Sequence, residues 1–198
     1  MTAITQGGPV SHPPTHAARS GPPALRRTEV EILVPGGWLQ GTLSIPSSQS
    51  LTDFLNAAGT FLKLADTLLP GGGARRVNFF ALQRDAVRMI APAAPAIPVE
   101  TEGVGGITSP WRISCLFDQG VLDGRLDFLV NLRLSDYLRQ QAGYLVVRDG
   151  LWQGAGDGEP RRWPVLLVNP GQVLGIVEGD EQPVAGHPGR LAATEWSA

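Results

Sequence analysis

Two stretches of the chain repeat one pattern: VEILVPGGWLQGTLSIPSSQSLTDFLNAAGTFLKLAD (residues 30–66) and ISCLFDQGVLDGRLDFLVNLRLSDYLRQQAGYLVVRD (residues 113–149). They align without a gap at an offset of 83 positions, and ten of the 37 aligned pairs are identical. Unrelated stretches of ordinary composition would share about two or three identities. After a three-residue insertion the match continues at an offset of 86, where residues 77–90 align with residues 163–176. These matches predict a tandem duplication.

Each copy contains five short apolar segments that are typical of β-strands. They cover residues 30–34, 38–45, 61–69, 77–82 and 86–90 in the first copy, and 113–117, 121–130, 144–147, 163–168 and 173–177 in the second. Gly41 interrupts the apolar face of the second segment, where a bulge would let the strand curl. A capping-box pattern from Ser50 to Asp53 predicts a short helical turn, and the second copy repeats it at residues 134–140. Short strands separated by Gly-rich turns predict an all-β fold of two small antiparallel barrels or sandwiches.

The order of these features resembles an Sm-like domain. A first strand and a glycine turn precede a long second strand with an internal glycine. An Asp and an Asn then lead to a third strand, and two short strands flank an Arg-containing turn. The resemblance covers residues 30–92 and 113–178. It implies two tandemly duplicated, five-stranded SH3/Sm-like small barrels, each with a short helical turn, similar to a bacterial Sm-like domain family of unknown function.

The resemblance also implies a candidate RNA-binding site. In Sm proteins the Asp/Asn pair and an Arg-Gly turn form a pocket for an RNA base, and the matching residues in this chain are Asn56 and Arg84. Arg139 replaces Asn56 in the second copy, and no glycine follows Arg84. These two departures disfavour RNA binding, whereas they leave the predicted fold unchanged.

A second candidate site lies in the loop before the fourth strand of each copy. Gly-rich segments lead to Arg75 and Arg76 in the first copy and to Arg161 and Arg162 in the second. Exposed main-chain N–H groups beside paired guanidinium groups can hold a phosphate or a carboxylate, so these arginines are candidates for binding RNA or another anion. Flexible hairpin loops with solubilising arginines are the alternative, since the Lys-Ser/Thr pair of a phosphate-binding loop is missing.

Net charge argues against nucleic acid as the main partner. The chain has 198 residues and a formal net charge of −2. Residues 29–92 carry five basic and five acidic side chains, and residues 113–178 carry six arginines and eight acids. Neither copy therefore offers the positive surface that attracts a phosphate backbone.

Histidine and cysteine are scarce. His12, His16 and His187 lie in the Pro/Gly-rich ends, and the single cysteine, Cys115, aligns with Ile32 as a small core residue. Disulfides, thiolate zinc sites and His-based triads are therefore excluded from the folded parts. We expect no catalytic residue, no cofactor and no metal, and so a protein that is not an enzyme.

Two pairs of matched acids have a structural and a catalytic interpretation. Asp53 and Asp136 are placed alike in the two copies, as in a two-lobed aspartic protease, but neither is followed by the Thr/Ser-Gly that this chemistry needs. A role at the start of a helical turn is favoured for both. Asp66 and Asp149 are expected to cap turns at strand ends.

The tryptophans offer a choice between base stacking and core packing. Trp38 and Trp163 lie in predicted strands, which favours packing. Trp152 lies in a Gly-rich stretch and is expected to be exposed.

The predicted organisation has five parts: a disordered Pro/Gly-rich tail (1–27), a first barrel (28–92), a Pro/Gly-rich linker (93–111), a second barrel (112–178) and a flexible C-terminal tail (179–198). No run of 18 apolar residues and no signal-peptide pattern occurs, so we expect no membrane association and a cytoplasmic location.

The function predicted from these features is a non-enzymatic protein-interaction, scaffold or assembly module. Small barrels expose strand edges that pair with other chains, so the expected partner is another protein or a second copy of this chain. The alternative is binding of RNA or an anionic ligand through the paired Gly-rich Arg-Arg loops.

Overall fold

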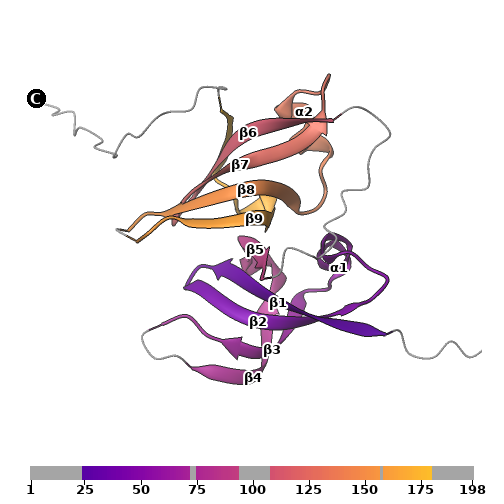
Figure 1. The fold of residues 1–198 in the computed structure, drawn as a ribbon, viewed down its shortest axis with the longest axis vertical. Coiled ribbons are helices and arrows are strands. Elements are labelled where there is room, and N and C mark those ends of the chain that lie inside the picture. The colour runs from indigo at the N-terminus through magenta and orange to yellow at the C-terminus, as the bar shows by residue number, and fades with distance from the viewer. Residues whose placement is uncertain (1–23, 72–74, 94–107, 157, 180–198) are drawn as a thin grey trace, which may run out of the picture.

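The computed structural model describes residues 24–71, 75–93, 108–156 and 158–179 (Figure 1). These segments are mostly β-strand, which confirms the predicted all-β class. Residues 1–23 and 180–198 of the two predicted tails lie outside the described residues, whereas residues 25–27 belong to the first strand, so the predicted end of the N-terminal tail at residue 27 is wrong. Residues 94–107 of the predicted linker, and residues 72–74 and 157 of the Arg-Arg loops, also lie outside them, whereas residues 108–111 belong to a strand, so the predicted end of the linker at residue 111 is wrong.

The strands fall into two halves with the same order of elements. The N-terminal half contains β1 (Leu25–Val34), β2 (Gly37–Pro46), α1 (Leu51–Ala57), β3 (Phe61–Leu68), β4 (Arg76–Gln83), a 3₁₀ turn (Arg84–Ala86) and β5 (Met89–Pro92). The C-terminal half contains β6 (Thr108–Phe117), β7 (Gly120–Leu129), α2 (Leu134–Gln140), β8 (Leu145–Gly154), β9 (Arg161–Val168), a 3₁₀ turn (Pro170–Gln172) and β10 (Gly175–Glu178).

Strand pairing confirms the duplication. Val34 pairs with Gly37 between β1 and β2, and Phe117 pairs with Gly120 between β6 and β7. The same pair therefore recurs 83 positions later in the chain. The closing strands keep the same relation at the second offset, because β5 pairs with β1 and β10 with β6 in matching register. The repeated sequence therefore specifies the same pairing twice.

A β-bulge explains four of the residues that the copies share. Gly41 of β2 stands opposite two residues of β3, one of which is Asp66 with a φ of 50°. Gly124 and Asp149, with a φ of 51°, form the same bulge between β7 and β8. The bulge expected at Gly41 is thus confirmed, and its left-handed residue is an aspartate, which tolerates that conformation better than most residues. The prediction that the two aspartates cap strand ends is wrong, since Asp66 lies inside β3 and Asp149 lies inside β8.

Three strands are much longer than predicted, namely β1, β6 and β8. β1 begins at Leu25 because it pairs with β2 along its whole length, and Leu25 lies opposite Pro46. β6 begins at Thr108 for the same reason, opposite Leu129. The cross-strand partner supplies hydrogen bonds that a short apolar run does not reveal.

The matched acids of the helical turns have structural roles. The N–H of Asp53 donates to Ser50 Oγ at 3.0 Å, and Ser50 Oγ donates to the Asp53 carboxylate at 2.6 Å, as the capping pattern predicts. Asp136 forms an ion pair of 3.1 Å with Arg139 on α2. Both helices have seven residues, so neither helix in the described residues is long enough to span a bilayer.

Each half buries its own apolar cluster. Cys115 is fully buried in the C-terminal half, and burial raises the pKa of its thiol to about 12, with a further contribution from Asp123. Trp152 is only 5% exposed and packs edge-on against Phe117 and Trp38. The prediction of an exposed Trp152 is therefore wrong, because β8 continues through the Gly-rich stretch and turns this ring inward.

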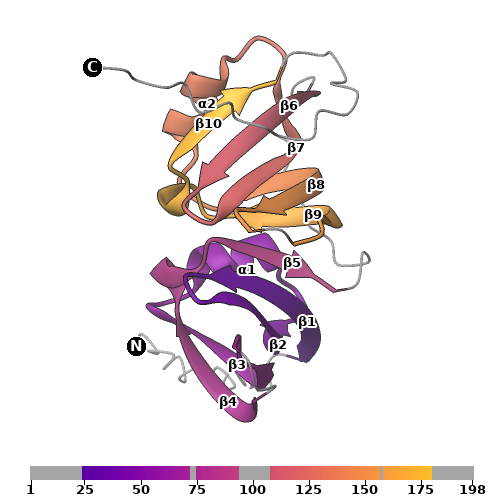
Figure 2. The same cartoon turned by 90° about the vertical axis from the view of Figure 1, so that its left-hand side faces the viewer.

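All ten strands in the described residues form one antiparallel sheet in the order β10-β6-β7-β8-β9-β5-β1-β2-β3-β4. The halves are joined where β5 pairs with β9, and Figure 2 shows these two strands side by side between the two halves. We call this contact the junction. Because each half contributes five consecutive strands, the outer strands of the sheet are β4 and β10, which we call the free edges.

Candidate functional site

The junction shows how strand edges of this chain bind each other. Met89 pairs with Val168 and Ile90 pairs with Leu167, and the N–H of Asn169 donates to the carbonyl of Arg88 at 2.9 Å. A short ladder of main-chain hydrogen bonds therefore connects the two halves.

Apolar side chains interlock across the junction. Leu33, Met89 and Ala91 of the N-terminal half belong to the buried cluster of the C-terminal half. In return, Tyr144, Val146 and Leu167 belong to the buried cluster of the N-terminal half. Each half thus completes its core with side chains from the other, and burial of this apolar surface stabilises the junction.

Arg161 lies at the centre of a polar and aromatic cluster on the junction. Its Nη2 is 2.8 Å from Glu31 Oε2, and its guanidinium carbon lies 4.7 Å from the ring centre of Trp38 and 4.8 Å from that of Trp163. Trp163 Nε1 also donates to Glu31 Oε2 at 3.0 Å. The guanidinium predicted to bind an external anion is therefore already bound to a carboxylate of the other half.

A second ion pair crosses the junction. Arg88 Nε donates to Asp118 Oδ1 at 2.9 Å, and Arg88 Nη2 donates to Asp118 Oδ2. The Arg88 side chain is buried, whereas that of Asp118 is half-exposed. This bidentate pair fixes the turn between β6 and β7 against the N-terminal half.

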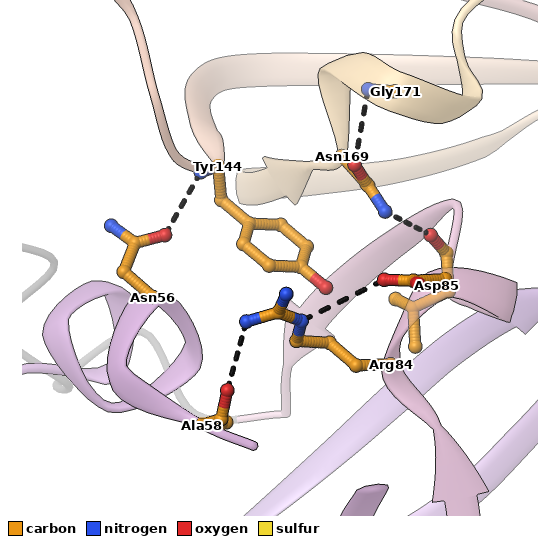
Figure 3. A network of polar contacts seen from close by, with 8 residues as sticks. Asn56, Ala58, Arg84, Asp85, Tyr144, Asn169 and Gly171 are labelled. Atoms are coloured by element: carbon orange, nitrogen blue, oxygen red, sulfur yellow. Dashed lines mark hydrogen bonds and ion pairs between the residues drawn. The ribbon is translucent and has the colours of Figure 1, made fainter. Parts of the chain in front are cut away.

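Asn56 and Arg84, the two residues suggested by the Sm-like pattern, come together beside the junction (Figure 3). Asn56 Oδ1 accepts a hydrogen bond of 3.1 Å from the N–H of Tyr144, and Arg84 Nη1 donates to the carbonyl of Ala58 at 2.8 Å. Together with the pair of 3.8 Å between Arg84 and Asp85, these bonds hold α1 and the turn after β4 in place.

A cavity of about 280 Å³ lies between these residues and the C-terminal half, and Asn169 and Tyr144 line it from that side. The buried Tyr144 hydroxyl has no hydrogen-bond partner among the described residues. Burial raises the pKa of Tyr144 to about 12. The charge of Asp85 adds to this increase, whereas the charge of Arg84 opposes it.

The remaining arginines of the two loops are not brought together. Arg75 and Arg76 precede and begin β4 at a free edge, whereas Arg162 lies on β9, which is separated from β4 by four strands. Arg76 lines an open cavity of about 810 Å³ with Arg27 and Asp66, which pair with each other at 2.7 Å. Binding of RNA or another anion stays a prediction, and the contacts of Asn56, Arg84 and Arg161 do not favour it.

Among the described residues, five of the seven large apolar side chains that are exposed lie on or beside the two free edges. Phe79 lies on β4 and Phe61 lies on the neighbouring β3. At the other end of the sheet, Val177 lies on β10, Leu174 precedes it and Leu116 lies on the neighbouring β6. Exposed apolar groups beside an unpaired strand are common on protein surfaces that bind other chains.

Comparisons of the chain with models of protein families, with curated proteins and with solved structures find no match. The fold defines the class, an all-β protein with two halves in one continuous sheet. Within the described residues, no three His, Cys, Asp or Glu side chains are grouped so that they could hold a metal ion.

The contacts of the junction were not predicted from the sequence. Glu31, Trp38, Arg88 and Asp118 gain their roles only from pairing between the halves. One signal was present: Val146 is apolar at an outward-facing strand position where the first copy has Lys63. An apolar side chain on both faces of one strand indicates that both faces are covered.

Proposed function

We propose that this chain is a non-enzymatic scaffold or assembly module that binds other protein chains through its free edges. Each half is, in this proposal, an SH3/Sm-like small barrel. The shared order β5-β1-β2-β3-β4 and β10-β6-β7-β8-β9 supports it, as does the bulge at Asp66 and Asp149, which bends the sheet.

The observation that carries the proposal is the orientation of main-chain groups at the free edges. The N–H of Arg84 donates to Thr60 across β4 and β3, and hydrogen bonding alternates along an antiparallel pair, so Ala81 directs its N–H and C=O outward. By the same alternation, the bond from Gly179 to Arg112 leaves the N–H and C=O of Ile176 directed outward from β10. Both edges thus offer a donor and an acceptor to an added strand.

A capture experiment with edge variants tests this function. Ala81→Pro and Ile176→Pro each remove an outward N–H and spare the bonds to the inner strand, so an edge strand tolerates them. The tagged chain and the double variant are incubated with a nuclease-treated lysate of the source cells. We expect proteins to be retained by the chain and lost with the variant. Equal retention by both proteins, or retention that needs intact RNA, would contradict the proposal.

Ala81→Val and Ile176→Val are the matched controls, because valine changes the side chain at the edge and keeps the main-chain N–H. We expect the valine variant to retain the same proteins as the unmodified chain. Similar thermal unfolding of all three proteins would show that the substitutions act at the edges and not on the fold.

A further inference from the structure

We infer that the partner at these edges is a second copy of this chain, joined head to tail, so that β10 of one copy pairs antiparallel with β4 of the next. The inference rests on the proposed function and specifies its partner. It follows from the duplication: β10 occupies in the C-terminal half the place of β5, and β4 occupies in the N-terminal half the place of β9. The junction therefore already contains the contact that two copies would form.

The offset of 86 gives the register of the new pair. At the junction Met89 pairs with Val168, and Ile90 pairs with Leu167. The corresponding pairs between copies are Gly175 with Leu82 and Ile176 with Ala81. Ile176 and Ala81 are also the residues whose N–H and C=O groups point outward, so both sides of this pair are ready to form two hydrogen bonds.

Apolar side chains support the same arrangement. Leu33 is 2% exposed and Tyr144 is 5% exposed because the junction covers them. Their counterparts at the free edges, Leu116 and Phe61, are 49% and 57% exposed. Two further pairs follow the same rule: Ala91 is buried and Val165 is partly buried at the junction, whereas their counterparts Val177 and Phe79 are exposed. A second copy would cover these side chains as the junction covers theirs.

Charge complementarity is kept although the residues differ. At the junction, Arg161 pairs with Glu31, which accepts a hydrogen bond of 3.0 Å from the cross-strand Gln40. The corresponding positions in the C-terminal half hold Ser114 and Asp123, hydrogen-bonded at 2.5 Å, so the acid has moved to the neighbouring strand. The counterpart of Arg161 is Arg75, which is exposed at the start of the free edge. Arg75 of one copy thus meets Asp123 of the next.

The second ion pair is replaced by an apolar pair. Arg88 and Asp118 correspond to Leu174 and Pro35, and both counterparts are exposed. Neither leucine nor proline carries a charge that would need a partner when buried. Because both members of the ion pair are replaced, no unpaired charge is left in the contact between copies.

The contact between copies is weaker than the junction. Val121 and Val77 stand where the junction has Trp38 and Trp163, so Arg75 lacks the two aromatic rings that contact Arg161. We therefore expect a reversible, concentration-dependent assembly. Because the contact joins two different surfaces, it propagates into a ring or a filament, and any closed ring contains an even number of halves.

Charge exchange in the purified full-length chain tests the inference. Sedimentation velocity is measured over a range of concentrations for the unmodified chain and for the variants Arg75→Glu and Asp123→Arg. We expect the unmodified chain to assemble and each variant alone to need at least tenfold higher concentration. In an equimolar mixture the two variants can alternate, which places opposite charges at every contact, and we expect this mixture to assemble within about threefold of the unmodified chain.

Three outcomes would overturn the inference: a monomer at all concentrations, assembly that neither variant weakens, or a mixture that assembles no better than its components. Ala81→Pro, with Ala81→Val as control, provides an independent test, because only the proline removes the donor to Ile176. A monomeric purified chain whose edges still retain another protein from the lysate would overturn the inference and leave the proposed function standing. A monomer that retains nothing would overturn both.

Discussion

Arg161 and Glu31 are 130 positions apart in the sequence, and 2.8 Å separates Arg161 Nη2 from Glu31 Oε2. This ion pair joins the start of β9 to β1 and places the guanidinium against both Trp38 and Trp163, whose rings also pack on each other with their centres 4.8 Å apart. Arg161, which the sequence predicts as a ligand for an external anion because it follows a Gly-rich loop, thus holds together the two halves of its own chain.

Replacing Arg161 should therefore weaken the fold. Both side chains of the pair are partly exposed, so the ion pair and the two aromatic contacts together contribute about 1–2 kcal/mol. We expect Arg161→Ala to lower the free energy of unfolding by that amount in urea titration. Arg162→Ala is the matched control, since this neighbouring side chain is exposed, and its effect should stay below about 0.5 kcal/mol. Equal effects of the two variants would contradict the role of Arg161.

Removing the partner of Arg88 should have a larger effect. Asp118→Ala leaves the buried Arg88 guanidinium without its carboxylate, and its Nη1 already lacks a partner among the described residues. Because Asp118 is half-exposed and water can partly replace it, we expect a loss of about 2 kcal/mol in the free energy of unfolding. Asp85→Ala, which removes a more exposed carboxylate paired with Arg84 at 3.8 Å, is the comparison and should cost less.

The two bulge glycines should differ in their tolerance of a side chain. A Cβ at Gly124 would collide with Val147 Cγ1 and lie 3.0 Å from the carbonyl oxygen of Arg148. A Cβ at Gly41 would meet Thr67 Oγ1 at 3.1 Å and Leu64 Cδ2 at 3.4 Å. We expect Gly124→Ala to cost about 1–3 kcal/mol and Gly41→Ala to cost less, as measured by thermal unfolding. The reverse order would show that the bulge geometry is wrong.

Stability should fall in alkaline solution. The pKa of Cys115 rises from 9.0 to about 12 in the folded chain, so the unfolded chain loses this proton at lower pH. The contribution of this thiol to the free energy of unfolding is fully present below pH 9 and is lost as pH rises towards 12, with a loss of about 1 kcal/mol by pH 10. Tyr144, whose pKa rises from 10.0 to about 12, adds to this loss above pH 10.

Two substitutions separate these contributions. Cys115→Val should make the unfolding temperature depend less on pH above pH 9. Tyr144→Phe should have the same effect above pH 10. The phenylalanine removes a hydroxyl that has no hydrogen-bond partner among the described residues, so the fold should tolerate it. An unchanged pH profile in both variants would contradict the burial of these groups.

The duplication and most strand positions can be predicted from the sequence, because alternation and glycine turns are local and occur twice. The junction cannot, because it depends on side chains such as Arg88 and Asp118 that meet only after both halves have folded. Trp152 shows the same limit: a Gly-rich neighbourhood suggests exposure, but its ring is covered by Phe117 and by Trp38 of the other half. Local pattern identifies the strands, whereas long-range pairing decides which of their residues are covered.

Hydrogen exchange at the free edges shows directly whether β4 and β10 bind another chain. Exchange of main-chain N–H groups is followed by mass spectrometry in dilute protein and in the assembled or partner-bound state. We expect peptides containing Ala81 and Ile176 to become protected on binding, while those from the junction, such as the peptide containing Ile90, stay equally protected in both states. Unchanged exchange at both free edges in a complex that has formed would contradict this expectation.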